Sequence, residues 1–157
     1  AMTNCGELGW ISDRRGYRYA PLDPVSGPRW PAMPAAMSAL AHRASRAAGF
    51  DGFTPDACLI NCYEPGSRLS LHQDRDETDL AAPVVSVSLG DDCLFRVGPP
   101  QRSAKTVSLR LQSGDVLVLG KEGRLAYHGV DRIYPDTSTL LKNSGRINLT
   151  LRRVTKP

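Results

Sequence analysis

The sequence predicts a mainly β protein, an antiparallel sandwich or jelly roll with one flanking helix. Two observations predict this class. After Pro55 the chain divides into short segments of apolar or alternating character, separated by turn residues at 64–66, 90–92 and 113–115. Before that point, one segment alone repeats its apolar residues with a helical period. Short strands at this spacing indicate antiparallel sheets rather than alternating strand–helix units.

The first segment, residues 1–31, is rich in glycine and proline, and we expect it to be irregular. Four aromatic residues alternate with arginines in it: Trp10, Tyr17, Tyr19 and Trp30. Such groups on a loop suit base stacking and phosphate contact. The alternative is that Tyr17 and Tyr19 form one face of a short strand. Trp10 stands among small and polar residues, so it is the better candidate for a ring that faces a partner.

Residues 34–48 predict a helix. Pro34 lies near its first turn, Met37, Leu40, Ala41 and Ala44 follow the helical period, and Gly49 suits the position after its end. The remaining segments predict short strands. These are 57–63, 69–73, 84–89, 93–97, 106–111, 116–119, 125–128 and 146–154.

The composition indicates one soluble globular domain over residues 1–157, with 41% hydrophobic and 23% charged residues. No apolar run has the length of a membrane span, and we expect no membrane partner. The net charge of +4 permits a nucleic-acid partner without requiring one. The first residues, 1–6, do not resemble a natural start, so we expect that a preceding segment is missing.

Cysteine usage indicates a reducing compartment. Four cysteines occur without a C-x-x-C pair, which disfavours a zinc knuckle. We expect free thiols and a cytoplasmic protein.

Three predicted strands carry polar groups on one face. Arg146, Asn148, Thr150 and Arg152 alternate with apolar residues, Asn61 and Tyr63 share a face of another strand, and His72 and Asp74 share a face opposite Leu71 and Gln73. One polar face alone would be the solvated side of a sheet. Three such faces with ligand-type groups are typical of the lining of a ligand cavity.

His72 and Asp74 form the first candidate metal site. On a strand, residues i and i+2 point to the same side, so an imidazole and a carboxylate would converge. His128 is the downstream candidate for a third ligand. Two histidines and one carboxylate are the facial triad of non-haem Fe(II) oxygenases. Taken alone, the H-x-D pair is more typical of a surface hydrogen bond than of a metal site.

Together these motifs resemble the AlkB family of Fe(II)- and 2-oxoglutarate-dependent dioxygenases, which repair alkylated nucleic-acid bases. The resemblance extends from about Met2 to Arg152. It rests on N-x-Y at Asn61, H-x-D-x-D-E at His72, Y-H-G at His128 and R-x-N-x-T-x-R at Arg146, with MTNCGELGW and TPDACLIN also fitting. It implies a double-stranded β-helix, or jelly-roll, core over residues 55–154 and a substrate-recognition lid over residues 1–31.

The resemblance also implies the cofactors and their ligands. His72, Asp74 and His128 would hold Fe(II) and form the catalytic centre. Arg146 would bind the far carboxylate of 2-oxoglutarate, since a guanidinium can meet a carboxylate with two parallel hydrogen bonds. Further hydrogen bonds to this cosubstrate would come from Asn61, Tyr63, Asn148 and Arg152. The products would be succinate, CO₂, formaldehyde and the unmodified base.

The implied substrate is 1-methyladenine or 3-methylcytosine in DNA or RNA, preferably single-stranded, with the damaged base flipped out of the stack. Trp10 would stack on that base, and Asp76 would read its exocyclic amino group. Weaker candidates for contacts with the substrate backbone are Tyr17, Arg68, Gln73 and Arg102, and an ordinary surface position is the alternative for each of them. We expect a monomer.

Some positions depart from the family pattern, and other functions stay open. Cys62 replaces a basic residue, Leu119 stands where an aromatic is common, and residues 98–105 match poorly. The main alternative is a 2-oxoglutarate-dependent hydroxylase of a protein or small molecule. A non-catalytic module of the same fold and a zinc hydrolase are further alternatives. The intact triad and Arg146 disfavour the first of these two, and the R-x-N-x-T-x-R strand has no role in the second.

Overall fold

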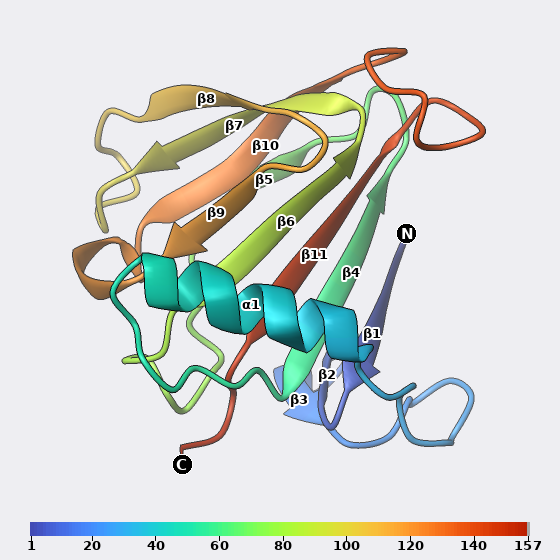
Figure 1. The fold of residues 1–157 in the computed structure, drawn as a ribbon, viewed down its shortest axis with the longest axis vertical. Coiled ribbons are helices and arrows are strands. Elements are labelled where there is room, and N and C mark those ends of the chain that lie inside the picture. The colour runs from blue at the N-terminus through green and yellow to red at the C-terminus, as the bar shows by residue number, and fades with distance from the viewer. Residues whose placement is uncertain (157) are drawn as a thin grey trace.

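The computed structural model describes residues 1–156 and contains two antiparallel sheets, a separate hairpin and one α-helix (Figure 1). The larger sheet has five strands in the order β1-β4-β11-β6-β9, and the smaller has four in the order β5-β10-β7-β8. The bounds are β1 (Met2–Gly6), β2 (Gly9–Asp13), β3 (Gly16–Ala20), α1 (Ala35–Ala47), β4 (Ala57–Tyr63), β5 (Leu69–His72), β6 (Val84–Gly90), β7 (Asp92–Gly98), β8 (Val107–Leu111), β9 (Val116–Leu119), η1 (Lys121–Gly123), β10 (Tyr127–Tyr134) and β11 (Arg146–Arg152).

The order of the strands is that of a jelly roll. From β4 to β7 the chain alternates between the larger and the smaller sheet, and it alternates again from β8 to β11. Such crossing places strands from distant parts of the sequence side by side. The predicted mainly β jelly-roll class with a flanking helix is therefore confirmed.

Helix α1 covers the outer face of the larger sheet (Figure 1). Ala41 of the helix is fully buried against a cluster that includes Cys58, Val85 and Leu151, one from each of three neighbouring strands. A second cluster lies between the sheets and includes Phe95, Leu111, Val130 and Ile133. Because side chains alternate along a strand, β11 gives its leucines to the helix side and leaves its arginines facing the smaller sheet.

The helix begins one residue later than predicted. Pro34 has φ −57° and ψ 136°, which is an extended conformation, so it precedes the helix instead of lying in its first turn. Gly49 follows the helix end with φ +84°, where glycine avoids the strain that a Cβ would bring.

The prediction that residues 1–31 are irregular is wrong for residues 2–20. These form β1, which pairs with β4 from Met2↔Asn61 to Gly6↔Ala57, and the β2–β3 hairpin, so the alternative that Tyr17 and Tyr19 share a short strand is confirmed. Residues 21–31 contain no named strand or helix, as predicted. Gly6 and Gly16 have positive φ and lie at strand ends, so the glycines that suggested irregularity mark turns between strands of five residues.

Strand β10 also differs from its prediction, because it continues from Tyr127 to Tyr134 and does not end at His128. Gly129 and Asp131 interrupt the apolar pattern there, and the register with β5 and β7 shifts at the same place, which is the mark of a β-bulge. The other strand ends lie within two residues of the predictions. None of the helices in residues 1–156 is both long and apolar enough to span a membrane.

A buried carboxylate fixes the long loop before β11. Asp91 is 1% exposed. Its Oδ1 accepts hydrogen bonds from the backbone N–H groups of Thr137 and Ser138, and its Oδ2 accepts from the Ser144 hydroxyl and the Gly145 N–H. Burial alone would raise the pKa of Asp91, but these hydrogen bonds lower it. The carboxylate therefore sets where β11 begins.

We expect Asp91→Asn to lower the free energy of unfolding by about 1–3 kcal/mol, because an NH₂ group would face the donors that the lost oxygen satisfied. Urea unfolding at neutral pH measures this. The folded-state pKa of Asp91 lies below its ordinary 3.8, so the stabilisation is present above that value and is lost as the pH falls through the lowered pKa. The exposed Asp51→Asn is the control, and an equal effect of both variants would contradict the assignment.

Candidate functional site

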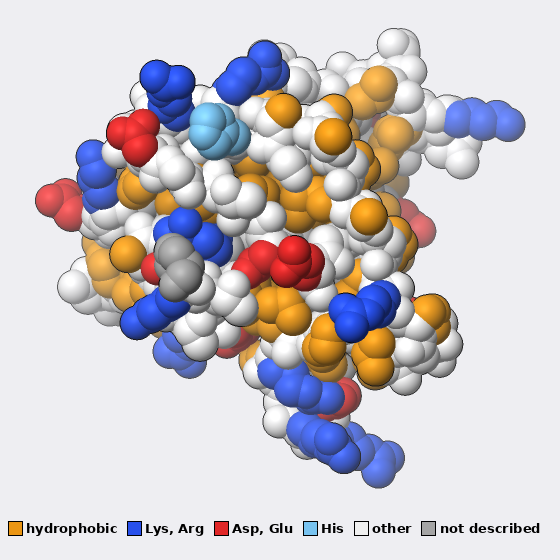
Figure 2. All heavy atoms as spheres, turned by 60° about the horizontal axis from the view of Figure 1, so that its bottom comes forward, with side chains coloured by type: hydrophobic (Ala, Val, Ile, Leu, Met, Phe, Trp, Pro, Cys, Tyr) orange, Lys and Arg blue, Asp and Glu red, His pale blue; other side chains and the backbone are white. Residues whose placement is uncertain are grey.

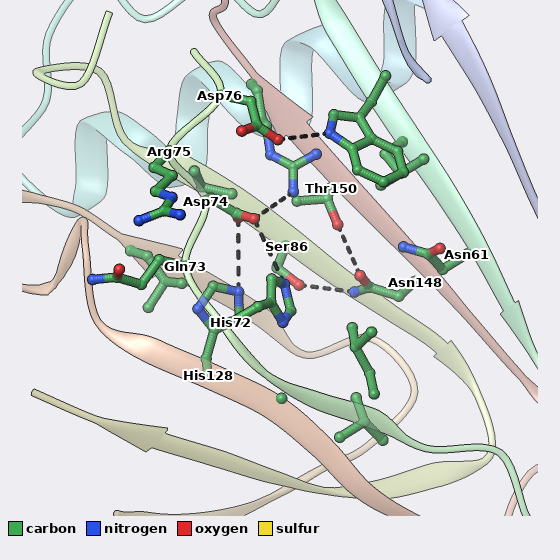
Figure 3. Close-up of a pocket in the computed structure, with 18 of the residues that line it drawn as sticks. Asn61, His72, Gln73, Asp74, Arg75, Asp76, Ser86, His128, Asn148 and Thr150 are labelled. Carbon is green, nitrogen blue, oxygen red and sulfur yellow. Dashed lines mark hydrogen bonds and ion pairs between the residues drawn. The ribbon is translucent and has the colours of Figure 1, made fainter. Parts of the chain in front are cut away.

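A cavity of about 670 Å³ opens between the two sheets and the β2–β3 hairpin. Its lining includes the polar faces of β11 and β4 and the end of β5 with Asp74, together with the start of β10. The three predicted polar faces therefore meet in one place. Figure 3 shows their side chains pointing toward one another from these strands.

His72, Asp74 and His128 converge at the base of this cavity, as predicted. One ligand atom from each of the three lies within 4.8 Å of the other two. His72 Nε2 lies 3.7 Å from Asp74 Oδ1, and His128 Nε2 lies 3.7 Å from Asp74 Oδ2. The reason for the convergence differs from the prediction, because β5 ends at His72 and Asp74 lies in the following loop. Gln73 consequently turns into the cavity instead of away from it.

Both imidazoles are oriented by a backbone carbonyl two residues earlier. His72 Nδ1 lies 2.9 Å from the Ser70 oxygen, and His128 Nδ1 lies 3.0 Å from the Ala126 oxygen. A carbonyl can only accept, so each Nδ1 carries the proton and each Nε2 keeps its lone pair for a metal. Burial lowers the pKa of His128 below its ordinary value, although Asp74 opposes this. A neutral imidazole is the form that binds metal.

The carboxylate of Asp74 is also prepared for a cation. Its Oδ1 pairs with Arg152 Nη2 at 2.9 Å, whereas its Oδ2 is buried with no hydrogen-bond partner among residues 1–156. Burial would raise the pKa of Asp74, but Arg152 and the two histidines together lower it to about 2. An ionised carboxylate with one free oxygen beside two imidazole nitrogens fits Fe(II).

Gly129 is required by the close approach of β5 to β10. A Cβ at this position would lie 2.5 Å from the Leu69 oxygen and 3.0 Å from the Ser70 oxygen. The second of these carbonyls, that of Ser70, is the one that accepts from His72 Nδ1. Any larger residue would push apart the strands that carry the two histidines.

A second buried cation lines the same cavity. Arg146 is 2% exposed, and its Nη2 donates to Ser88 Oγ at 2.9 Å. Its Nε and Nη1 have no partner among the described residues. Tyr63 stands opposite Arg146 in the β4–β11 register. Burial raises the pKa of Tyr63 to about 12 although Arg146 opposes this, so its hydroxyl stays a donor. A buried guanidinium with free donors fits a carboxylate of a bound diacid.

Comparison with known proteins decides the family. The family model described as the 2OG-Fe(II) oxygenase superfamily matches residues 1–152. The alpha-ketoglutarate-dependent dioxygenase AlkB of Escherichia coli is 51% identical over 156 residues, covering 99% of this chain and 72% of that one. An AlkB homolog of Caulobacter vibrioides is 53% identical over 153 residues, covering 98% and 68%.

This chain belongs to the AlkB family. The solved structure of OsALKBH1 agrees, with a TM-score of 0.84 and 34% identity over 97% of this chain and 77% of that one. Shorter matches include a tRNA demethylase of Schizosaccharomyces pombe, 42% identical over 53% of this chain and 28% of that one, and a DNA N(6)-methyladenine demethylase of Arabidopsis thaliana, 41% identical over 63% and 25%. As an AlkB-family enzyme, this chain is a dioxygenase that depends on iron and 2-oxoglutarate.

The other expected cosubstrate residues of this AlkB-family chain line the cavity, but two of them already have protein partners. Asn61 lies in the lining with Tyr63. Asn148 Nδ2 donates to Ser86 Oγ at 2.8 Å and to the Val87 oxygen at 3.0 Å. Arg152 pairs with Asp74 at one side of its guanidinium. The sequence could not show these contacts, because they join strands that are distant along the chain.

The expected substrate residues of the AlkB-type site gather at the mouth of the cavity. Trp10 Nε1 donates to Asp76 Oδ2 at 2.9 Å (Figure 3). The Tyr17 ring is 67% exposed and stacks on Trp10, with centroids 5.3 Å apart and planes at 21°. The Arg102 guanidinium lies 5.8 Å from the Tyr127 ring centroid. All four expected residues line the cavity.

The structure also places two of the weaker candidates for substrate contacts and two positions that depart from the family pattern. Arg68 lies outside the main cavity, beside a smaller hollow, and Gln73 Nε2 donates to the Leu125 oxygen at 2.7 Å. Leu119 lines the cavity, while Cys62 is exposed. On the face shown in Figure 2, the Lys and Arg side chains lie in several separate groups, some at the outline and some nearer the middle.

Sequence reasoning gave three residues of this AlkB-family protein no role beside the His72–Asp74–His128 cluster. Glu77 belongs to the H-x-D-x-D-E motif, yet its buried position beside Arg152 and Arg124 was not foreseen. Tyr19 donates its hydroxyl to Glu77 Oε1 at 2.5 Å. Arg124 carries no signal in the sequence, because it stands in a turn whose place beside Asp74 depends on the fold.

We expect Arg146→Ala to weaken 2-oxoglutarate binding by about 2–5 kcal/mol, since a carboxylate would lose its buried cationic partner. Calorimetric titration of the Mn²⁺-loaded protein, with Mn²⁺ replacing iron to prevent turnover, measures this. The exposed Arg43→Ala on α1 is the charge-matched control. Unchanged affinity in a folded Arg146→Ala protein would remove Arg146 from this role.

Proposed function

We propose that this chain oxidatively demethylates N-alkylated bases of DNA or RNA, preferably 1-methyladenine and 3-methylcytosine. One observation carries the proposal. A single cavity contains a His–Asp–His cluster with a free carboxylate oxygen, a buried Arg146 with free donors, and an aromatic ring beside a carboxylate at its mouth. The cavity volume lies in the range of ligand pockets.

The catalytic centre is proposed to consist of His72, Asp74 and His128. Iron held there, with 2-oxoglutarate and O₂, supplies the oxidation that hydroxylates an N-methyl carbon, which then leaves as formaldehyde. The cosubstrate is a diacid, and Arg146 would bind its far carboxylate. The neutral hydroxyl of Tyr63 and the amide of Asn61 would donate further hydrogen bonds. Asn148 and Arg152 would share donors that they also give to Ser86 and Asp74.

The base is proposed to enter the cavity flipped out of its strand. Trp10 would stack on it, which is worth about 1–3 kcal/mol per base. A methylated adenine or cytosine of this type is cationic, so the Asp76 carboxylate would favour it electrostatically. Tyr17 and Arg102 would contact the adjoining backbone. Flipping costs least from a single strand, which supports that preference.

The remaining proposals concern the setting of the reaction. We propose a monomer as the active unit, since one protomer already brings its metal, cosubstrate and substrate candidates into a single cavity. The four cysteines are free thiols, which supports a reducing, cytoplasmic location.

The test is product analysis with methylated DNA and RNA oligomers, single- and double-stranded, under Fe(II), ascorbate and 2-oxoglutarate. We expect formaldehyde and unmodified base in step with succinate. We expect His72→Ala to lose metal binding and all formaldehyde release, because two remaining ligands leave the site incomplete. Turnover of 2-oxoglutarate without demethylation of any oligomer would instead favour a hydroxylase of proteins or small molecules.

We expect Asp76→Ala to reduce base selectivity more than it reduces 2-oxoglutarate turnover without substrate. The Asp76→Asn variant keeps an oxygen for Trp10 and removes the negative charge. It should therefore lose about 1–4 kcal/mol of preference for cationic 1-methyladenine over neutral 1-methylguanine, the Coulomb energy of such a pair between water and a protein surface. Competition assays with the two oligomers measure this. If Asp76→Asn instead lowered the demethylation of both oligomers equally, Asp76 would have a structural role only.

A further inference from the structure

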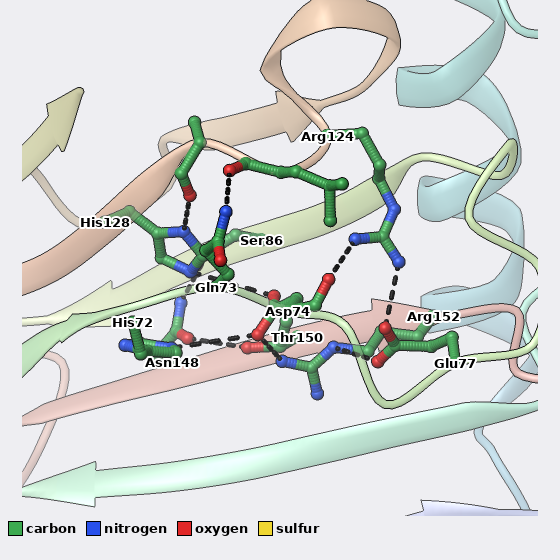
Figure 4. A network of polar contacts seen from close by, with 12 residues as sticks. His72, Gln73, Asp74, Glu77, Ser86, Arg124, His128, Asn148, Thr150 and Arg152 are labelled. Carbon is green, nitrogen blue, oxygen red and sulfur yellow. Dashed lines mark hydrogen bonds and ion pairs between the residues drawn. The ribbon is translucent and has the colours of Figure 1, made fainter. Parts of the chain in front are cut away.

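A buried ionic cluster lies behind the proposed iron site. It consists of the carboxylates of Asp74 and Glu77 and the guanidinium groups of Arg124 and Arg152, all less than 9% exposed (Figure 4). Glu77 Oε2 accepts from Arg124 at 3.0 Å, Glu77 Oε1 lies 3.3 Å from Arg152 Nε, and Arg152 Nη2 lies 2.9 Å from Asp74 Oδ1. The two positive and two negative charges balance, so the cluster can stay buried.

Arg124 occupies a particular place in this cluster, because it alone binds the main chain of a metal ligand. Its Nη1 donates to the backbone oxygen of Asp74 at 2.6 Å, and its Nε donates to the Ala82 oxygen at 2.8 Å. With the bond to Glu77, each of its three nitrogens has an acceptor in the segment between β5 and β6.

This contact matters because Asp74 has no strand to hold it. Strand β5 ends at His72, so no ladder of hydrogen bonds fixes the backbone of Asp74. Arg124 stands just after η1, in the segment that leads to the third ligand. The next two carbonyls of that segment, of Leu125 and Ala126, accept from Gln73 and from His128 Nδ1. The segment 124–126 therefore contacts the backbone of Asp74, the side chain of its neighbour Gln73 and the ring of His128.

We propose that Arg124 is a positioning residue for the iron site, which sets the separation of Asp74 and His128 before metal binds. The proposal rests on the proposed metal site and is independent of the substrate. Arg124 contacts none of the side-chain atoms proposed to bind the metal and is not itself a lining residue of the cavity, so its effect would pass through the backbone of Asp74. Partners that orient metal ligands typically change metal affinity by about 10–100-fold when they are removed.

The test is a titration of the metal-free protein with Mn²⁺, in which electron paramagnetic resonance measures the bound ion. Thermal unfolding without metal is measured in parallel. Lysine cannot reproduce three donors in a fixed plane. We therefore expect Arg124→Lys to weaken Mn²⁺ binding about 10–100-fold at temperatures where the protein stays folded.

Arg153→Lys is the matched control. Arg153 holds the same segment at Asp79, with Nε 2.8 Å from Oδ2, but does not contact Asp74 or Glu77. We expect this variant to lower the unfolding temperature while keeping the wild-type Mn²⁺ affinity. An equal loss of affinity in both variants would reduce Arg124 to a general stabilising role and overturn the proposal.

A second variant keeps the test decisive if Arg124→Lys does not fold. In Arg124→Met/Glu77→Gln, the glutamine oxygen still accepts from Tyr19 and Arg152, and no unpaired charge stays buried. A folded double variant with weakened Mn²⁺ binding supports the role, and one with wild-type affinity overturns it. If the His72→Ala variant bound Mn²⁺ as tightly as the wild type, the metal site and this role of Arg124 would both be overturned. Failure to demethylate with intact Mn²⁺ binding would count against the proposed substrate only.

Discussion

The contact between Arg152 and Asp74 is the interaction on which the rest of the site depends. It keeps the carboxylate ionised inside the protein and fixes Oδ1, which also lies near His72 Nε2, while Oδ2 stays free of hydrogen bonds beside His128 Nε2. A lone carboxylate at this depth would take up a proton. A lone arginine would be equally costly. Glu77 adds a second negative charge, which pairs with both Arg152 and Arg124. Tyr19 of the β2–β3 hairpin donates its hydroxyl to Glu77 and so connects this cluster to the hairpin.

Strand β11 connects this chemistry to the stability of the fold. Its leucines pack toward α1, while its two arginines face the cavity, one at each end of the strand. The two sets alternate, so a shift of one residue in the pairing with β4 and β6 would expose the leucines and remove both guanidinium groups from the cavity. The same apolar packing that selects the register therefore also selects the site.

Alternation and turn residues allowed most of the core to be predicted from the sequence. Most strands from Ala57 onward and the helix follow from patterns within a few residues. The convergence of His72 and Asp74 with His128 was expected from the resemblance of the separate motifs to the AlkB family. The strands of residues 1–31 could not be recognised, because they are five residues long and glycine-bounded, and they become strands by pairing with β4 and with each other. The place of Asp74 off the strand, the partners of Asn148 and the contacts of Arg124 were equally invisible. Each of them depends on segments that only the fold brings together.

The shortness of β5 makes the stability of this part of the fold depend on bound metal. This strand is four residues long, lies at the edge of its sheet and pairs with β10 through two register positions. Iron bound between His72 and His128 would add a cross-link between these two strands. By mass action, a ligand that binds only the native state stabilises it in proportion to the logarithm of its concentration. Without iron this cross-link would be absent, so the free energy of unfolding of the metal-free protein would be lower than that of the metal-bound protein.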